Sequence, residues 1–159
     1  MQRGFQKLQA WRKADDLVAE IFRLTEEEIP DRRRWLSLQI VRAAFSVTSN
    51  IAEGYGRSSL GDYLRFLEIA GASLNEVENA LHAIRRNKVL PADAIKTAEE
   101  LRWATGNLLF GLSRSLRNKL NAKGAWQRGI SDERSEYETL AWDEDIVHVP
   151  GSKFHEPEA

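Results

Sequence analysis

Arginine is the residue type whose positions in this chain best suit the binding of a ligand at the protein surface. Arg32, Arg33 and Arg34 are adjacent and fall in the expected first turn of a helix, where the macrodipole disfavours each exposed cation by about 0.3–1 kcal/mol. The planar guanidinium matches the geometry of a phosphate group. We therefore expect a nucleic-acid-binding surface. Its predicted residues are Arg32, Arg33, Arg34, Arg42, Arg57 and Arg65.

A solvated charged face is the alternative for these arginines, and the charge balance by itself favours it. Residues 1–120 carry 19 basic and 15 acidic side chains, a modest net charge of +4. Asp31 and the acidic run 26–28 lie close in sequence to the arginine triplet and would neutralise it. An oligomer would multiply the positive surface, so oligomerisation and RNA binding would support each other.

Few groups of residues in the sequence have the types and spacing that catalysis or metal binding requires. His82 has no second histidine or carboxylate three or four residues further on, so we expect a surface histidine there. Gly54 and Gly56 do not follow a predicted strand, and the chain contains no Walker sequence and no serine-nucleophile motif. We expect a protein that is not an enzyme and that holds no metal and no cofactor.

The overall composition is that of an ordinary globular protein. The chain has 159 residues, 42% of them hydrophobic, and a net charge of −1. It has no cysteine, so it needs no oxidising compartment. No run of about 18 apolar residues occurs, and the N-terminus lacks the apolar core of a signal peptide. We therefore expect a cytoplasmic protein.

Apolar residues recur with a helical period in four segments. Pro30, Pro91 and the glycine-containing stretch 53–59 separate these segments. We predict helices at about 5–25, 33–54, 59–88 and 91–120. The third has a bundle seam with alternating steps of three and four residues, formed by Leu60, Tyr63, Leu67, Ala70, Leu74, Val77, Leu81 and Ile84. Because short connections make neighbours antiparallel, we predict an all-α, up-and-down four-helix bundle over residues 1–120.

A polar cluster marks the junction between the second and third helices. Ser59 and Asp62 have the spacing of a capping box, and the two glycines before them would adopt the left-handed conformation that ends a helix. Glu53 would pair with Arg57, and Asn50 would bond free carbonyls at the end of the second helix. A ligand site is the alternative to this structural role. The predicted structural motif is Asn50, Glu53, Gly54 and Ser59.

The second helix carries two apolar stripes, whereas a four-helix bundle buries one stripe per helix. The first stripe is Leu36, Ile40, Ala43, Val47 and Ile51, and the second is Leu38, Val41, Phe45, Thr48 and Ala52. Either this helix is central with a wide buried face, or the second stripe contacts another subunit; we favour the subunit contact. The predicted oligomer interface is Leu38, Val41, Phe45, Thr48 and Phe66.

Residues 121–159 differ from the bundle in composition. They carry 9 acidic and 4 basic side chains, and they contain glycines and prolines without a sustained apolar period. We predict an irregular acidic C-terminal tail, which would fold back and screen the arginines. In an alternative function, the chain is a protein-interaction module whose tail, anchored by Trp126 and Trp142, recruits or inhibits a protein partner.

Several short runs carry a family resemblance. They are Phe5-Gln-Lys-Leu8 with Trp11, Gln39-Ile-Val-Arg42-Ala-Ala44, Asn50-Ile-Ala-Glu-Gly54 and Phe66-Leu67-Glu-Ile-Ala70. Over about residues 5–120 the chain resembles the four-helix-bundle family called 23S rRNA-intervening sequence proteins. The run from Gln39 to Gly54 is the most specific part of this resemblance.

The resemblance implies a bundle that tends to form a homopentamer, is encoded in some bacteria within insertions in ribosomal RNA genes, and has no established enzymatic activity. The chain is also similar in architecture to a related branch, the accessory variability determinants of diversity-generating retroelements. That branch consists of pentameric bundles that bind nucleic acid and the element's reverse transcriptase. We thus expect a bacterial, cytoplasmic homo-oligomer that serves as an RNA-binding or accessory scaffold, with RNA or DNA as a partner and no membrane association.

Overall fold

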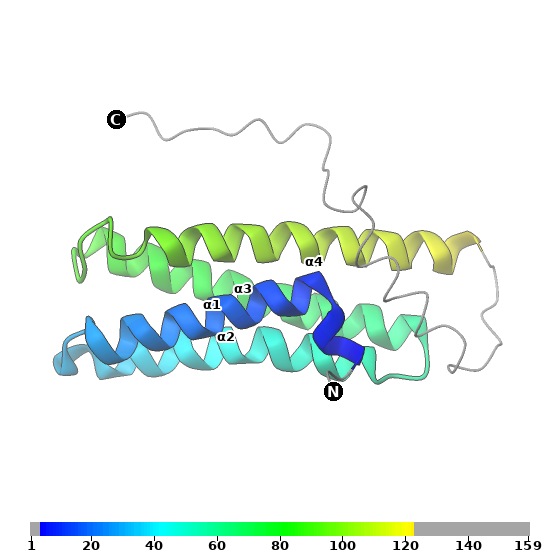
Figure 1. Cartoon of the computed structure of the whole chain (residues 1–159), viewed down its shortest axis with the longest axis horizontal. Helices are drawn as coiled ribbons and strands as arrows, with labels where there is room; N and C mark the ends of the chain where they lie inside the picture. The colour runs from blue at the N-terminus through cyan, green and yellow to red at the C-terminus, as the bar shows by residue number, and fades with distance from the viewer. Residues whose placement is uncertain (1–3, 123–159) are drawn as a thin grey trace, which may run out of the picture.

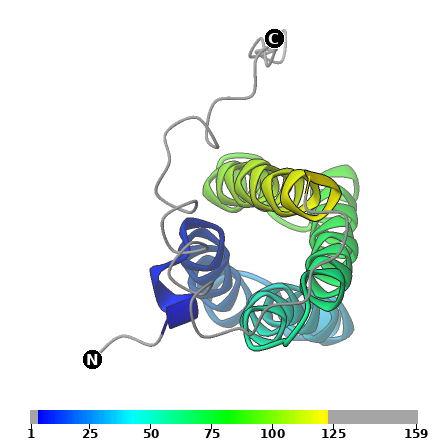
Figure 2. The same ribbon diagram turned by 90° about the vertical axis from the view of Figure 1, so that its right-hand side faces the viewer.

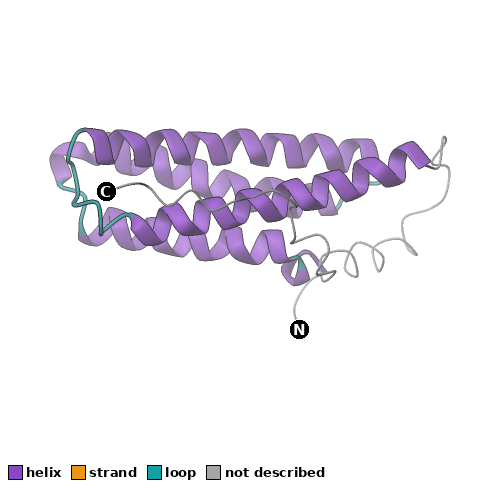
Figure 3. Cartoon of the chain, turned by 90° about the horizontal axis from the view of Figure 1, so that it is seen from above, coloured by secondary structure: helices purple, strands orange, loops and turns teal. Residues whose placement is uncertain are grey.

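The computed structural model describes residues 4–122, which form helices joined by loops, with no strand in that range (Figure 3). Four long α-helices follow one another: α1 (Gln9–Glu27), α2 (Arg34–Tyr55), α3 (Leu60–Arg86) and α4 (Lys96–Ala122). Two short 3-10 helices precede α1 and α2: η1 (Gly4–Lys7) and η2 (Asp31–Arg33). None of the described helices is both long enough and apolar enough to cross a bilayer. The prediction of an all-α fold is confirmed.

The helices run alternately up and down and occupy the four corners of a bundle (Figures 1 and 2). α2 packs on α3, α3 on α4, α4 on α1 and α1 on α2. The α1–α2 and α3–α4 connections share one end of the bundle, which we call the two-loop end. The α2–α3 connection and the last residues of α4 lie at the opposite, one-loop end. Residues 28–33 and 87–95 therefore reach the same end although they are far apart in sequence.

The apolar seam of α3 and the first stripe of α2 lie in the core, as predicted. All eight seam residues of α3 and all five residues of the first stripe of α2 are buried. In α1 the buried face includes Leu17 and Leu24, whereas Trp11 is only half-buried. Trp11 packs edge-on against Phe5 of η1, with 5.3 Å between the ring centroids. The short helix η1 therefore covers a side chain that a single stripe could not bury.

Two predicted helix starts are wrong. η1 precedes Gln9, so α1 begins four residues later than expected. α4 begins at Lys96 instead of residue 91. The backbone N–H groups of Ala94 and Lys96 donate to carbonyls three residues earlier, at 3.2 and 3.3 Å. These bonds make tight turns after Pro91, so the α-helical ladder is established only afterwards.

The turn between α2 and α3 does not use a left-handed glycine, which corrects that prediction. α2 continues through Gly54, and Gly56 at its end is right-handed, with φ of −78°. Among the described non-glycine residues, Lys88 has the positive φ, 50°, just after α3. The N–H groups of Lys88 and Val89 donate to the carbonyls of Arg85 and Ile84 at 3.1 and 3.0 Å. This is a Schellman closure with lysine where glycine is usual.

Candidate nucleic-acid interface

Arg32, Arg33 and Arg34 lie at the two-loop end, where η2 leads into α2. The first turn of α2 contains no acidic residue, and no side chain caps it. Within residues 4–122, none of the three arginines forms an ion pair. Arg32 and Arg34 are exposed, and Arg33 is half-buried. The positive end of the helix dipole therefore lies next to three uncompensated cations.

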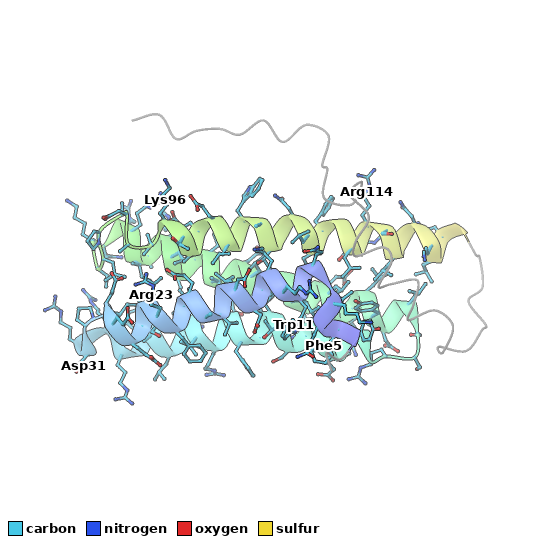
Figure 4. The ribbon with its side chains drawn as sticks, in the orientation of Figure 1. Phe5, Trp11, Arg23, Asp31, Lys96 and Arg114 are labelled. Atoms are coloured by element: carbon cyan, nitrogen blue, oxygen red, sulfur yellow. The ribbon has the colours of Figure 1, made fainter. Side chains whose placement is uncertain are left out.

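Two of the glutamates expected to neutralise this triplet, Glu27 and Glu28, pair with Arg23 on α1 instead. Arg23 lies 2.8 Å from Glu20, 2.6 Å from Glu28 and 3.5 Å from Glu27. Hydrogen bonds to Glu20 and Glu28 raise the pKa of Arg23. Figure 4 shows Arg23 and Asp31 toward the same end of the bundle. Within the described residues Asp31 forms no ion pair, so local acids leave the triplet unpaired.

The six predicted arginines do not form one continuous surface. Arg42 is exposed along α2, whereas Arg57 and Arg65 lie at the one-loop end. The 22 residues of α2, at about 1.5 Å per residue, separate the two ends by roughly 33 Å. RNA binding by these six arginines stays a prediction; among the described residues, Arg42 and the triplet form no ion pair, whereas Arg57 and Arg65 do.

Arg57 and Arg65 cover the Phe66 ring beside the α2–α3 turn. Their guanidinium carbons lie 4.4 and 4.8 Å from the centroid of the Phe66 ring. Arg57 also pairs with Glu53, as predicted, and Arg65 lies 3.9 Å from Asp62. These cation–π contacts leave Phe66 only 7% exposed. Phe66 therefore belongs to the single chain's packed interior and not to an exposed interface.

The polar side chains at this turn form local hydrogen bonds, with one correction to the predicted partners. Ser59 caps α3: the backbone N–H of Asp62 donates to Ser59 Oγ at 3.1 Å, and that hydroxyl donates to the Asp62 carboxylate at 2.9 Å. Asn50 does not bond carbonyls at the end of α2. Its Nδ2 donates to the Ser46 carbonyl at 2.7 Å, and Ser46 Oγ lies 2.9 Å from Ser73 Oγ on α3. Asn50 thus supports a polar link between two packed helices.

The second stripe of α2 is exposed only in part. Leu38 and Phe45 of the predicted stripe, together with Trp35 beside them, are between 57% and 62% exposed. Val41 packs partly against the core, and buried Thr48 donates its hydroxyl to the Phe45 carbonyl. We call Trp35, Leu38, Arg42 and Phe45 the outer face of α2. Thr48, like Phe66, is a core residue and is removed from the predicted interface.

A second cluster, not predicted from the sequence, lies on α3 and α4. Arg85 pairs with Glu99, and Arg102 pairs with Glu78, so that two ion pairs bridge these helices. Trp103 lies beside them and is 44% exposed. Burial lowers the pKa of Arg102. These five residues lie outside the apolar seams of α3 and α4. Their proximity depends on the register between the two helices, so the sequence does not reveal it.

No metal site is found among residues 4–122, where no three His, Asp or Glu side chains are placed to hold an ion. His82 is exposed on α3, as predicted. Trp126, Trp142 and the acidic residues of the tail lie outside the described residues. The protein partner expected for the tail therefore stays a prediction.

Comparison with known families identifies the bundle. The family model for 23S rRNA-intervening sequence proteins matches residues 6–111. The chain belongs to this family. The match runs from η1 into α4 and confirms the resemblance carried by the motifs of α2 and α3. The likeness of this family member to retroelement accessory proteins stays a prediction.

A solved relative supports the fold of this family member. It is a protein of unknown function from the S23 ribosomal protein family of Bacteroides thetaiotaomicron, with a crystal structure at 1.70 Å resolution. The TM-score is 0.62 at 22% sequence identity, and the similarity covers 66% of this chain and 98% of that one. At this identity the likeness concerns the fold alone. No match is found among curated proteins.

Proposed function

We propose that this 23S rRNA-intervening sequence protein is a non-enzymatic, cytoplasmic, homo-oligomeric scaffold that binds RNA at its two-loop end. The observation that carries the proposal is the unpaired triplet Arg32, Arg33 and Arg34, which spans the end of η2 and the first residue of α2. A phosphate bound there would meet both the helix dipole and the planar donor forks of arginine. It would offset the unfavourable placement of three cations at a helix N-terminus.

Other cations support the same surface. Arg86 ends α3 at the two-loop end and Lys88 follows it; both are exposed, and neither forms an ion pair with a described residue. Lys96 begins α4 at this end and lies 4.0 Å from Glu100 (Figure 4). A strand that crosses this end would meet arginines from α2 and cations from the α3–α4 connection. Each neutralised phosphate would release counterions, so binding would weaken as the salt concentration rises.

Self-assembly is the second part of the proposal. The outer face of α2 presents three large apolar side chains to solvent, and a contiguous exposed apolar face usually marks an interface. A groove of about 360 Å³ lies beside it, with Phe22 and Ile29 of the α1 side facing Leu38 and Val41 of α2. The family resemblance favours five copies. A ring of five would repeat the arginine triplet five times and strengthen binding by multivalency.

An RNA titration over salt with two matched variants tests the function. We would measure polarisation of a labelled single-stranded RNA with the full chain, between about 50 and 200 mM salt. R32Q/R33Q/R34Q should weaken binding about tenfold at low salt and reduce the slope of log affinity against log salt by about two. The variant R114Q/R117Q/K119Q removes the same charge from the one-loop end and should have a smaller effect; Figure 4 shows Arg114 there.

The triplet variant should keep the wild-type helicity and thermal midpoint, since none of the three arginines holds a described ion pair. Equal losses in the two triple variants would mean that binding follows net charge and not the triplet. Absence of RNA binding by the unaltered protein at about 50 mM salt would contradict the function itself.

A further inference from the structure

A groove at the two-loop end lies directly beside the arginine triplet. It has a volume of about 360 Å³ and runs between the last turns of α1 and the first turns of α2. Phe22 and Leu38, which are 42% and 57% exposed, line it together with Val41. Arg34 of the triplet lines it at the two-loop end. The single chain thus leaves apolar surface uncovered next to unpaired cations.

The lining residues of α2 have a spacing that an extended chain can match. Arg34, Leu38 and Val41 follow one another along one face of α2 and span about 10 Å of its axis, at about 1.5 Å per residue. In an extended segment every second side chain shares a face, at intervals of about 6.6 Å. A carboxylate followed by two apolar residues at alternate positions spans about 13 Å, and the length of the arginine side chain takes up the difference.

The sequence beyond the described residues contains this pattern at Asp145, Val147 and Val149. Asp143 and Glu144 come directly before it, so three adjacent carboxylates match three adjacent arginines, and such charged pairs form the stronger hydrogen bonds. No lysine or arginine occurs within residues 143–149, which we call the acidic–apolar segment. Its charge and its apolar spacing therefore both complement the groove.

One other run in the tail has the same spacing, at Glu138, Leu140 and Trp142. It contains a single carboxylate, and Arg134 lies four residues before that carboxylate. The acidic–apolar segment is therefore the better match for three unpaired arginines.

The chain after α4 is long enough to bring this segment to the groove. α4 ends at Ala122 at the one-loop end, and its 27 residues span about 40 Å. Residues 123–142 can extend over about 65 Å at about 3.3 Å per residue. The segment can thus return along the bundle and reach the two-loop end of its own chain.

Two acidic side chains of the groove restrict what can bind there. Glu26 and Asp31 also line it and oppose an acidic occupant, although Arg32, Arg33 and Arg34 outnumber them. Charge alone therefore gives a small net attraction, and burial of apolar side chains has to supply the rest. The occupant needs apolar residues as well as carboxylates, and a purely acidic segment lacks them.

We propose that the acidic–apolar segment of the same chain docks in this groove, with Asp145 beside Arg34 and with Val147 and Val149 against Leu38 and Val41. Once docked, the segment occupies the triplet and competes with RNA for it. This regulatory role rests on the proposed RNA-binding function, whereas the contact itself does not.

Introduced cysteines test the contact in the full chain, which has no cysteine of its own. S37C/V147C pairs half-buried Ser37, which lines the groove, with the segment. N87C/V147C is the control, because exposed Asn87 follows α3 at the same end of the bundle but outside the groove. Under mild oxidation, S37C/V147C should form an intramolecular disulfide about tenfold faster than the control, since docking raises the local concentration of the two thiols. Mobility on a non-reducing gel measures the rate.

Charge variants in the S37C/V147C background locate the contact. D143N/E144Q/D145N and R32Q/R33Q/R34Q should each remove most of the rate advantage over the control. D132N/E133Q/E136Q removes the same charge from an earlier part of the tail and should preserve the advantage. A labelled single-stranded RNA should slow the disulfide, because it competes for the triplet. Circular dichroism checks that every variant is folded.

The outcomes separate this inference from the proposed function. Equal rates for S37C/V147C and N87C/V147C overturn docking, whether or not RNA binds. An intermolecular disulfide places the tail of a second copy in the groove and overturns docking within one chain. Equal losses in the two acidic variants overturn the assignment to residues 143–149. A fast, triplet-dependent disulfide in a protein that binds no RNA supports docking and overturns the RNA-binding function.

Discussion

Gly54 on α2 lies so close to Tyr63 on α3 that a Cβ atom at position 54 would sit 2.8 Å from Tyr63 Cδ2. The Cβ of Phe66 would be 2.9 Å away. Both distances are shorter than a normal van der Waals contact, and the neighbouring side chains are buried. The glycine is therefore required by the close approach of two helices and not by the conformation of a turn.

Gly54→Ala should lower the free energy of unfolding by roughly 1–3 kcal/mol, because the added methyl group overpacks the contact with Tyr63. Gly61 on α3 provides the control, since a Cβ there would meet nothing within 4 Å. Gly61→Ala should be neutral or stabilise the protein by up to about 1 kcal/mol, the difference in helix propensity. Urea unfolding followed by circular dichroism measures both, and stabilisation by Gly54→Ala would refute the packing argument.

Charged residues on the outer face of α2 should dissociate the proposed oligomer. L38E/F45E places two carboxylates among exposed apolar side chains, so it should yield helical monomers in light scattering. Val41 is left unchanged because it packs against the core. N75E/N79E adds the same charge at exposed positions of α3 and should preserve assembly. If L38E/F45E unfolds, the face stabilises the single chain; if it remains oligomeric, the interface lies elsewhere.

Removal of residues 123–159 should strengthen RNA binding several-fold at low salt. This segment contains 9 acidic and 4 basic side chains, so its loss removes net negative charge that competes with phosphate. The gain should shrink as salt rises. A full-length variant with Asp132, Glu133, Glu136, Glu138 and Asp143 changed to amides should reproduce most of the gain. Weaker RNA binding after truncation would contradict screening by the tail.

The features predicted correctly depend on short sequence separations. The seam of α3, the Ser59 cap and the Glu53–Arg57 pair each join residues three or four positions apart, and helical geometry places such residues together. The wrong starts of α1 and α4 also have a local cause. The 3-10 turns at η1 and after Pro91 compete with the α-helix over a few residues, a choice that apolar periodicity does not report.

Four amphipathic helices, their order, the family, and the charge contrast between residues 1–120 and 121–159 follow from the amino-acid sequence alone. Which side chains share a surface follows only from the packing of the helices. This packing joins Arg102 to Glu78 across 24 positions, buries Phe66 beneath two arginines, and places Arg57 and Arg65 at the end opposite the triplet. The helical period sets the direction of each side chain about the axis of its own helix. The residues that this side chain contacts on other helices depend on how the helices pack and in which register.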